Sequence, residues 1–492
     1  MKLRLLILLP LLNFTYNIKA SDFYWVGGTG NWSDYASHWA TTSGGLVFQI
    51  TVPGPNDDVF FDANSFSTSN DTVYVDSTLI YCRDMDWIGA TGNPVFISLS
   101  YSTTLRIFGS FILNSGMQWY FFGYLSFESS SAGNIINTNG VALGNYCAVT
   151  FYGNGAEWSL QDSLAVSNDI NLYSGTLRTN NYNIACSSFN VNAYSPSALY
   201  LGTSVVNCYN NWYADSAMFT LDADSSVIIV GYDFSGGTAM AYHIVYASGV
   251  SSSYTTYDTI FFFSNNNSLQ GFNNTIGLAL FDNYANLYSA NANSFGKAVF
   301  NNGDVAIDGN NSFDTLIFNN PGKTITLKNG STQIINDSLL LNGSCSAMIT
   351  LNSSIAGTQA TISKANGNAV IDYIVLKDIN VTGGASFVAN NSVDAGNNSG
   401  WAINSLAPKN LYWVGGTGNW SDNNHWAITS GGAGGNCIPT QFDNVFFDTN
   451  SFLSSNDTVY VDVSPAYCHD MDWTGATGNP VFISLSYSTT LR

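Results

Sequence analysis

Charged residues are scarce in this chain. Asp, Glu, Lys and Arg make up 9% of the 492 residues, and 33 acidic residues outnumber 13 basic ones, which gives a net charge of −20. Such a chain repels phosphate backbones, so nucleic acid is excluded as an expected partner. General disorder is excluded too, because disordered chains have few apolar residues, whereas 45% of this chain is hydrophobic and 14% is aromatic.

Cysteine is sparse as well, with seven residues in the chain. Proteins held together by a disulfide framework have a much higher cysteine density, and the CxxC spacing typical of zinc sites is absent from the sequence. We therefore expect the cysteines to be mostly buried and unpaired, acting as small hydrophobic side chains. A bridge between Cys437 and Cys468 is an alternative that the sequence leaves open.

Long apolar runs are missing beyond the N-terminus. There, Lys2 and Arg4 flank an apolar run over residues 5–12, and Ala20 is a small residue suited to cleavage. This pattern predicts a signal peptide over residues 1–20 and therefore export of the chain. No other apolar run reaches the roughly 18 residues of a membrane span, so we expect none once the signal peptide is removed.

What the chain has in abundance is internal repetition. Residues 24–106 return as residues 412–492, with 59 identities over the 81 positions of the second copy. A period this long indicates a tandem, monomeric array of modules rather than one compact enzyme. We expect a first head at 21–106, a body at 107–401, a linker at 402–410, and a truncated second head at 411–492.

The body has the pattern of many short strands. Segments rich in Val, Ile, Phe and Tyr are interrupted by Gly, Asn, Asp or Ser about every 8–12 residues, and helical periodicity is absent. Clear examples are residues 149–152, 226–230, 259–263, 324–327 and 347–351. A chain of β-sandwiches and a β-solenoid both fit this pattern.

A finer repeat favours the solenoid. The segment 293–302 recurs 18 residues later as 311–320, which suits coils of about 18–25 residues stacked at the spacing of paired strands, ~4.8 Å. The register predicts four stacked pairs: Phe295 on Phe313, Phe300 on Phe318, Asn301 on Asn319 and Asn302 on Asn320. The predicted fold is therefore all-β, a parallel β-helix with a repeated β-rich head, and right-handed by the general rule for parallel crossovers.

The head motif also supports a resemblance. The run Trp-Val-Gly-Gly-Thr-Gly-Asn-Trp-Ser-Asp at 25–34, His38-Trp39, and the segments 58–66 and 81–87 resemble the opening of a repeat found in very large secreted proteins of Bacteroidota, and residues 372–401 resemble its closing coil. The resemblance implies a right-handed parallel β-helix, a role as adhesin or surface protein, and type IX secretion. It names no ligand.

Tryptophans of the heads are the first candidate site. Exposed Trp rings stack on sugars, and each head carries three of them close together: Trp25, Trp32 and Trp39, then Trp413, Trp420 and Trp426. Alternatively, these rings cap the open end of the solenoid, which repeat arrays require. The sequence favours the capping role over ligand binding.

Acidic residues of the heads are the second candidate site. Hard oxygen ligands for Ca²⁺ are available from Asp57, Asp58, Asp62 and Asn64, and from Asp443, Asn444, Asp448 and Asn450 in the second copy. Their spacing differs from the Asp-x-Asp-x-Asp-Gly loop, so turn-forming hydrogen bonds are the favoured role. No other cofactor is expected.

The most enzyme-like pair is Asp84 with Asp86, repeated as Asp470 and Asp472. Two carboxylates at i and i+2 of a strand share a face, as in glycosidases. However, Arg83 beside the pair is replaced by His469 in the second copy, and the few basic residues of the body form no cluster. We therefore expect no enzymatic activity.

The sequence thus predicts a secreted adhesin or stalk on the outer surface of a bacterial cell, with a polysaccharide or a surface protein as partner. A carbohydrate-active β-helix enzyme and a pure spacer for a further module are the alternatives.

Overall fold

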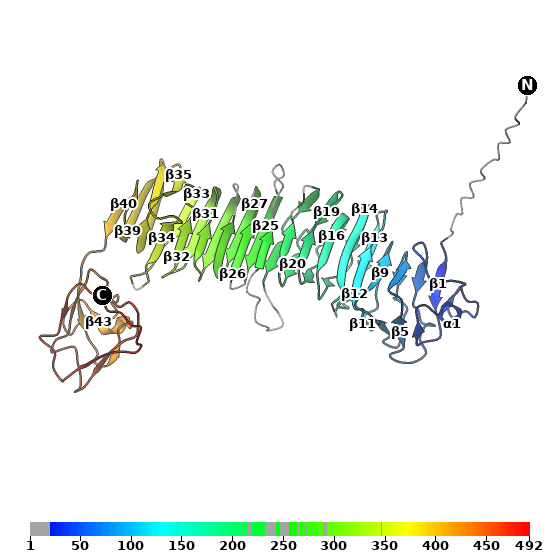
Figure 1. Cartoon of the computed structure of the whole chain (residues 1–492), viewed down its shortest axis with the longest axis horizontal. Helices are drawn as coiled ribbons and strands as arrows, with labels where there is room; N and C mark the ends of the chain where they lie inside the picture. The colour runs from blue at the N-terminus through cyan, green and yellow to red at the C-terminus, as the bar shows by residue number, and fades with distance from the viewer. Residues whose placement is uncertain are drawn as a thin grey trace, which may run out of the picture. The chain divides into compact units, whose positions relative to one another are not determined.

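The structure is a computed structural model that describes residues 20–144, 146–214, 216, 218–231, 243–246 (backbone only), 255–263, 266–271, 273–288, 293–345 and 347–492. The expected signal peptide lies, apart from Ala20, outside the described residues. Strands make up 50% of the structure and helices 2%, and parallel strands stack into a β-solenoid of about 18 turns. The predicted fold class is confirmed (Figure 1).

The chain divides into two compact units, which are described separately. The first comprises residues 1–204 with 218–222, and the second comprises residues 205–217 with 223–492. The elements of the first unit are α1 (Tyr35–His38), β1 (Asp22–Trp25), β2 (Gly30–Asn31), β3 (Trp39–Ala40), β4 (Asp58–Phe60), β5 (Thr72–Val75), β6 (Leu79–Cys82), β7 (Met85–Asp86), β8 (Val95–Ser98), β9 (Thr103–Ile107), β10 (Phe111–Ile112), β11 (Gln118–Tyr120), β12 (Gly123–Phe127), β13 (Asn134–Asn137), β14 (Ala148–Leu160), β15 (Leu164–Ala165), β16 (Ile170–Arg178), β17 (Ile184–Cys186), β18 (Phe189–Val191), β19 (Ser197–Tyr200) and β22 (Phe219–Asp222).

The first head continues into the solenoid without a break. Strand β9 crosses the expected boundary between residues 106 and 107 and pairs in parallel with β6 on one side and β12 on the other. Within the head, β1 pairs antiparallel with β3 and parallel with β4. The head is thus the beginning of the coil stack, closed on one side by the β1–β3 pair.

The coils of the first unit are held together by columns of buried apolar side chains. Strands β9, β12, β14, β16 and β18 pair in parallel, one per coil. Their registers align Leu105, Leu125, Val149, Ile170 and Phe189, all fully buried, in one column. Because side chains alternate along a strand, every second residue of these strands points to solvent.

The second unit has the same architecture. Its solenoid strands are β20 (Val205–Cys208), β21 (Trp212–Ala214), β23 (Val227–Val230), β24 (His243–Tyr246), β25 (Thr255–Phe262), β26 (Asn266–Gln270), β27 (Asn274–Phe281), β28 (Tyr284–Tyr288), β29 (Ser294–Asn301), β30 (Val305–Ile307), β31 (Asn311–Asn319), β32 (Thr324–Leu327), β33 (Thr332–Leu341), β34 (Ile349–Ser353), β35 (Ala360–Lys364), β36 (Asn368–Asp372), β37 (Ile374–Lys377), β38 (Ile379–Gly383), β39 (Ser386–Asp394) and β40 (Ala402–Ser405). Each of the five segments named in the sequence analysis contributes to a strand, namely β14, β23, β25, β32 and β34.

Aromatic and amide ladders run through this solenoid. Phe295 stacks on Phe313 at 4.9 Å between ring centroids, and Phe300 stacks on Phe318 at 5.1 Å, as predicted. The Asn319 side chain donates to Asn301 Oδ1 (3.0 Å), which confirms the third predicted pair. Among the described residues, 11 of the 15 non-glycine residues with positive φ are asparagines, so the Asn content serves the left-handed corners of the coils.

The second head is a small module with its own core. Its elements are β41 (Asn410–Trp413), β42 (Gly418–Asn419), η1 (Asn423–His425), β43 (Trp426–Ala427), β44 (Asn444–Phe446), β45 (Thr458–Val461), β46 (Met471–Asp472) and β47 (Val481–Ser484). The core is a cluster of buried residues around Trp413, Trp420, Trp426 and Phe447. Strand β40 lies within the expected linker and pairs with β39.

Two cysteines correct the expectation of unpaired thiols. Cys345 and Cys437 form a disulfide with 5.6 Å between their Cα atoms, so Cys437 pairs with a residue of the solenoid and not with Cys468. The two partners are 92 residues apart in the sequence, which is why sequence proximity pointed to the wrong cysteine. Cys82 and Cys147 are buried thiols, as expected. Among the described residues, no helix has the length and hydropathy needed to cross a membrane.

Candidate functional site

The six tryptophans of the sequence analysis form the cores of the two heads. Their exposed fractions are 0–1%. The Trp25 indole donates to the Gly28 carbonyl (2.8 Å) and the Trp39 indole to the Trp32 carbonyl (2.9 Å), and the second copy repeats both bonds. No ring face of these six side chains is open to solvent, so the geometry supports the structural role and offers nothing on which a sugar could stack.

The position of His38 explains why residue 30 of the glycine-rich motif is a glycine. His38 stacks on Trp25 at 4.7 Å and lies 2.7 Å from the Val26 carbonyl through Nδ1. A Cβ atom on Gly30 would come within 2.0 Å of His38 Nε2, so only glycine fits. The same arrangement recurs in the second head around His425 and Gly418.

The acidic residues of the heads make turn hydrogen bonds. The Asp57 carboxylate accepts hydrogen bonds from the backbone N–H groups of Ser21 and Gly54, and the Asp62 carboxylate accepts one from the backbone N–H of Asn64. In the second head, Asp443 and Asp448 make the same kinds of bond. Asn64 of the first head and Asn450 of the second each donate to a serine hydroxyl. Among the described residues, no group of three or more His, Cys, Asp or Glu side chains is arranged to hold a metal ion.

A further acidic residue anchors the glycine turn. The Asp71 carboxylate accepts bonds from the N–H groups of Ser67 and Thr68 and from the hydroxyls of Thr68 and Thr29. Burial opposes ionisation of this carboxyl, but the hydrogen bonds outweigh burial and lower its pKa to about 2. Asp457 has the same role in the second head, and its pKa is lowered mainly by the backbone N–H of Ser454.

An ion pair accounts for the replacement of Arg83. Arg83 donates to both carboxylate oxygens of Asp58, through Nε at 2.7 Å and through Nη2. In the second copy both partners change together, because Asn444 stands in place of Asp58 and His469 in place of Arg83. His469 instead lies 3.3 Å from Asp470. The exchange therefore concerns a structural pair.

Asp84 and Asp86 point to the same side of β7, as the alternation predicts, with buried Met85 between them. Asp84 accepts from Ser110 N (2.6 Å), and Asp86 accepts from Ile88 N (2.8 Å). Burial is the main cause that raises the pKa of Asp84 above its ordinary value. Both carboxylates thus make structural hydrogen bonds, Asp84 to the start of the body and Asp86 within the head.

The candidate site lies elsewhere, on the outward face of the solenoid strands of the first unit. We call it the tyrosine face, and it comprises Tyr101, Tyr124, Tyr146, Tyr152, Tyr173 and Tyr194. Five of these side chains are 49–71% exposed, and Tyr173 is half-buried. They lie on or beside strands β9, β12, β14, β16 and β18, whose inward residues form the columns described above.

One end of the tyrosine face is hollowed. Tyr101, Tyr124 and Tyr146 surround an open cavity of about 380 Å³ together with Gly123 and Asn168. The Tyr101 ring lies 6.3 Å from that of Tyr146. The Asn168 side chain donates to the Tyr146 carbonyl (3.1 Å), which fixes one wall.

Backbone geometry at this hollow is unusual. Tyr146 has φ +66°, a left-handed conformation that is costly for a bulky residue. Gly123 has φ +137°, and a Cβ atom there would meet the Thr103 carbonyl oxygen at 2.2 Å. Gly123 thus lines the hollow with backbone alone, and the Tyr146 ring that also lines it is exposed.

The other end of the face is a ladder of three rings. Tyr152 and Tyr173 lie 5.1 Å apart, and Tyr173 stacks on Tyr194 at 5.4 Å. Burial is the main cause that raises the pKa of Tyr173, followed by its neighbours Tyr194 and Tyr152. Along the chain, Tyr146 at one end and Tyr152 at the other are six residues apart, which spans at most roughly 20 Å.

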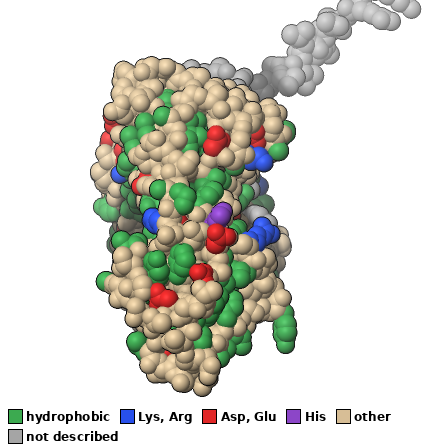
Figure 2. All heavy atoms as spheres, turned by 90° about the vertical axis from the view of Figure 1, so that its left-hand side faces the viewer, with side chains coloured by type: hydrophobic (Ala, Val, Ile, Leu, Met, Phe, Trp, Pro, Cys, Tyr) green, Lys and Arg blue, Asp and Glu red, His purple; other side chains and the backbone are tan. Residues whose placement is uncertain are grey.

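Between the two ends, the outward side chains are mostly uncharged. Asn190 donates to Asn171 (3.1 Å), and the one ion pair recorded there joins Arg106 to Glu128 (3.2 Å). Figure 2 draws a different part of the molecule, the side that carries the second head, and there too Lys, Arg, Asp and Glu are scattered among hydrophobic and uncharged polar groups. The tyrosine face therefore offers ring faces, hydroxyls and amides rather than charge.

Sequence reasoning missed this site, although a signal was present. Tyr152, Tyr173 and Tyr194 recur at intervals of 21 residues, and Tyr101, Tyr124 and Tyr146 at intervals of 23 and 22. These intervals are close to the length of one coil, which is 19 to 24 residues between the paired strands of this region, so the tyrosines fall near one another on successive coils. Comparison with protein-family models, with curated proteins and with solved structures finds no match to the chain.

Proposed function

We propose that this chain is a non-catalytic surface protein that binds polysaccharide through its tyrosine face. The observation that carries the proposal is the recurrence of outward tyrosines on or beside the parallel strands of successive coils, with a hollow at one end. The coils stack at ~4.8 Å, which is of the same order as one sugar residue in an extended polysaccharide. A polymer lying across the strands would therefore meet one ring per coil.

The chemistry of the face fits an uncharged polysaccharide. Tyrosine ring faces are electron-rich and attract the C–H groups of a pyranose, while the phenol hydroxyls hydrogen-bond to sugar hydroxyls. Tyrosine also has few rotatable bonds, so little entropy is lost when its ring is fixed by a ligand. A strongly anionic polymer is disfavoured by the net charge of −20.

Several observations support display outside the cell. The Cys345–Cys437 disulfide requires an oxidising compartment. The N-terminal pattern of a signal peptide and the resemblance to secreted Bacteroidota repeat proteins favour the same location, the outer surface of a bacterial cell. Tandem units would then multiply weak contacts into avidity, as expected of an adhesin.

The test is binding to immobilised neutral polysaccharides, such as cellulose, xylan and mixed glucans. Tyr124→Ala and Tyr146→Ala should each weaken binding to the retained polymer about tenfold, which corresponds to ~1.4 kcal/mol per ring. The matched control is Tyr288→Ala, because Tyr288 is 59% exposed and lies in the second unit. Equal losses in all three variants would refute the proposal.

Two further assays, of binding to cell surfaces and of oligosaccharide release, separate the alternatives. Binding to a cell surface that is lost after protease treatment but survives periodate oxidation would indicate a protein partner instead. Release of soluble oligosaccharide, abolished by Asp84→Ala, would indicate an enzyme. Absence of binding to any surface, with the fold intact, would leave the role of a spacer.

A further inference from the structure

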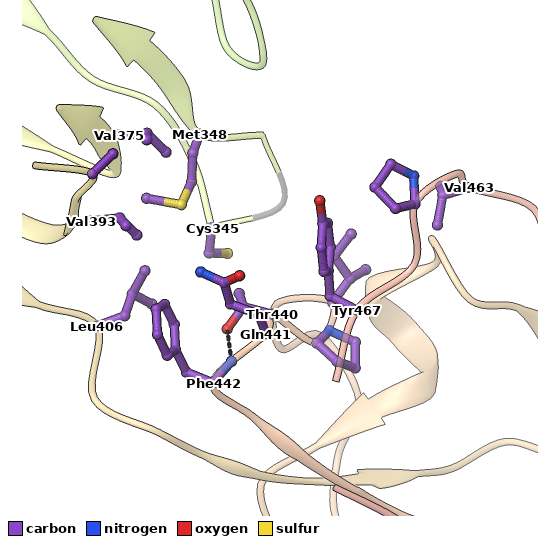
Figure 3. A pocket seen from close by; sticks show the side chains of 14 residues that line it. Cys345, Met348, Val375, Val393, Leu406, Thr440, Gln441, Phe442, Val463 and Tyr467 are labelled. Atoms are coloured by element: carbon purple, nitrogen blue, oxygen red, sulfur yellow. Dashed lines mark hydrogen bonds between the residues drawn. The ribbon is translucent and has the colours of Figure 1, made fainter. Parts of the chain in front are cut away.

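The second head contacts the last coils of the second unit's solenoid through a face that differs from its counterpart in the first head. Cys345 follows β33, Cys437 lies in the loop between β43 and β44, and their disulfide joins the two parts. Beside the disulfide lies a mostly apolar cavity of about 500 Å³. Figure 3 shows Met348, Val375 and Val393 on its solenoid side and Phe442 and Tyr467 on the side of the second head.

The two heads can be compared position by position, because they share 59 of 81 residues. Eight residues of the second head line the cavity: Ile438, Pro439, Thr440, Gln441, Phe442, Val463, Pro465 and Tyr467. Six of these eight differ from the first head, against 22 of 81 overall. The substitutions are thus concentrated on the face that touches the solenoid.

The direction of these substitutions is informative. Where the second head has Phe442 and Val463, both half-buried, the first head has Asn56 and Ser77. Where the second head has Cys437, the first head has Thr51, which is exposed, as is Asn56. Two positions of this face are therefore polar in the first head and apolar in the second, and the cysteine is present only in the second head, where the face meets a solenoid. Thr440 and Gln441 change in the opposite direction, since the first head has Gly54 and Pro55 there.

We propose that this face is the docking surface that fastens one repeat unit to the next, with the end of the preceding solenoid as its partner and the Cys345–Cys437 disulfide as its lock. The cavity explains why a lock is needed. Apolar groups surround it without filling it, so the packing across the junction is weaker than in a close-packed core. The disulfide keeps the partners at high effective concentration despite that loose packing. The proposal does not depend on the ligand of the tyrosine face.

The test uses the full chain and the substitutions that the first head already contains. Cys437→Thr removes the lock with a residue that the same loop tolerates in the first head, and the double variant Phe442→Asn/Val463→Ser weakens the apolar contact while keeping the disulfide. Cys468→Ser is the matched control, since Cys468 lies in the same head and is not in a disulfide. Hydrogen exchange of the loop 437–442 and of residues 343–345 and 347–348 reports on docking.

With the lock removed, we expect exchange in both segments to accelerate about tenfold or more, since the link across a 92-residue separation is lost. Phe442→Asn/Val463→Ser should accelerate hydrogen exchange less than Cys437→Thr does, and Cys468→Ser should leave it unchanged. Unchanged exchange in Cys437→Thr would overturn the proposal. So would full alkylation of Cys345 and Cys437 in the unreduced wild-type chain, because it would show that the lock is absent.

Discussion

The aromatic ladder in the solenoid strands of the second unit permits a quantitative prediction. Phe300 is fully buried and lies between Phe281, at 4.7 Å, and Phe318, at 5.1 Å. Phe300→Ala removes a large buried side chain and two ring contacts, which costs about 3–5 kcal/mol. Because each coil is stabilised only by its neighbours, this loss should be local, in β27, β29 and β31.

The appropriate assay is native-state hydrogen exchange, since a chain of this length does not unfold in a single step. A loss of 3–5 kcal/mol predicts amide exchange about 100-fold to 4000-fold faster in those three strands, with the second head unaffected. Lys297→Ala is the control, because Lys297 lies on the same strand and is exposed. If Phe300→Ala accelerates exchange no more than Lys297→Ala, the ladder does not stabilise the coils and the reasoning is wrong.

Three further predictions concern the first head. Lowering the pH from 4 to 2 should reduce the free energy of unfolding by up to about 2 kcal/mol, because the pKa of Asp71 is about 2 in the folded chain and 3.8 ordinarily. The stabilisation by ionised Asp71 is complete above about pH 4 and is lost as the pH falls through 2, so Asp71→Asn should lack this pH dependence in thermal unfolding. Gly30→Ala should cost about 1–3 kcal/mol by displacing His38, measured by tryptophan fluorescence on heating, and a loss no greater than that of an exposed Gly→Ala change would contradict the contact. Arg83→Ala should cost about 1–3 kcal/mol, whereas Asp58→Asn/Arg83→His, the pair found in the second head, should recover most of it; a double-mutant cycle without coupling would refute the pairing.

The coil register could be predicted from the sequence because it is written in a short local repeat. Phe295 and Phe313 are 18 residues apart in matching contexts, and a parallel solenoid is the simplest fold that stacks them. The strands followed from their β-branched and aromatic composition between turn-forming residues. No global information was needed for either conclusion.

The site and the disulfide were harder to predict, for different physical reasons. The tyrosines of the tyrosine face recur about once per coil, but a tyrosine looks the same in sequence whether it points inward or outward, and only the strand alternation decides. Trp25 and Trp39 illustrate the same ambiguity with the opposite outcome, because they point inward. The Cys345–Cys437 pair depends on how the second head meets the solenoid, which local sequence does not encode.

The alternation of the strands in the first unit has a consequence for how such a surface can change. Inward columns and asparagine corners fix the backbone, so outward positions fall on a regular grid, spaced ~4.8 Å from coil to coil and ~6.6 Å along each strand. A substitution at Thr150 or Asn171 would alter one grid point and leave the columns beneath it intact. The solenoid is therefore a template on which recognition chemistry can be rewritten point by point while the scaffold stays the same.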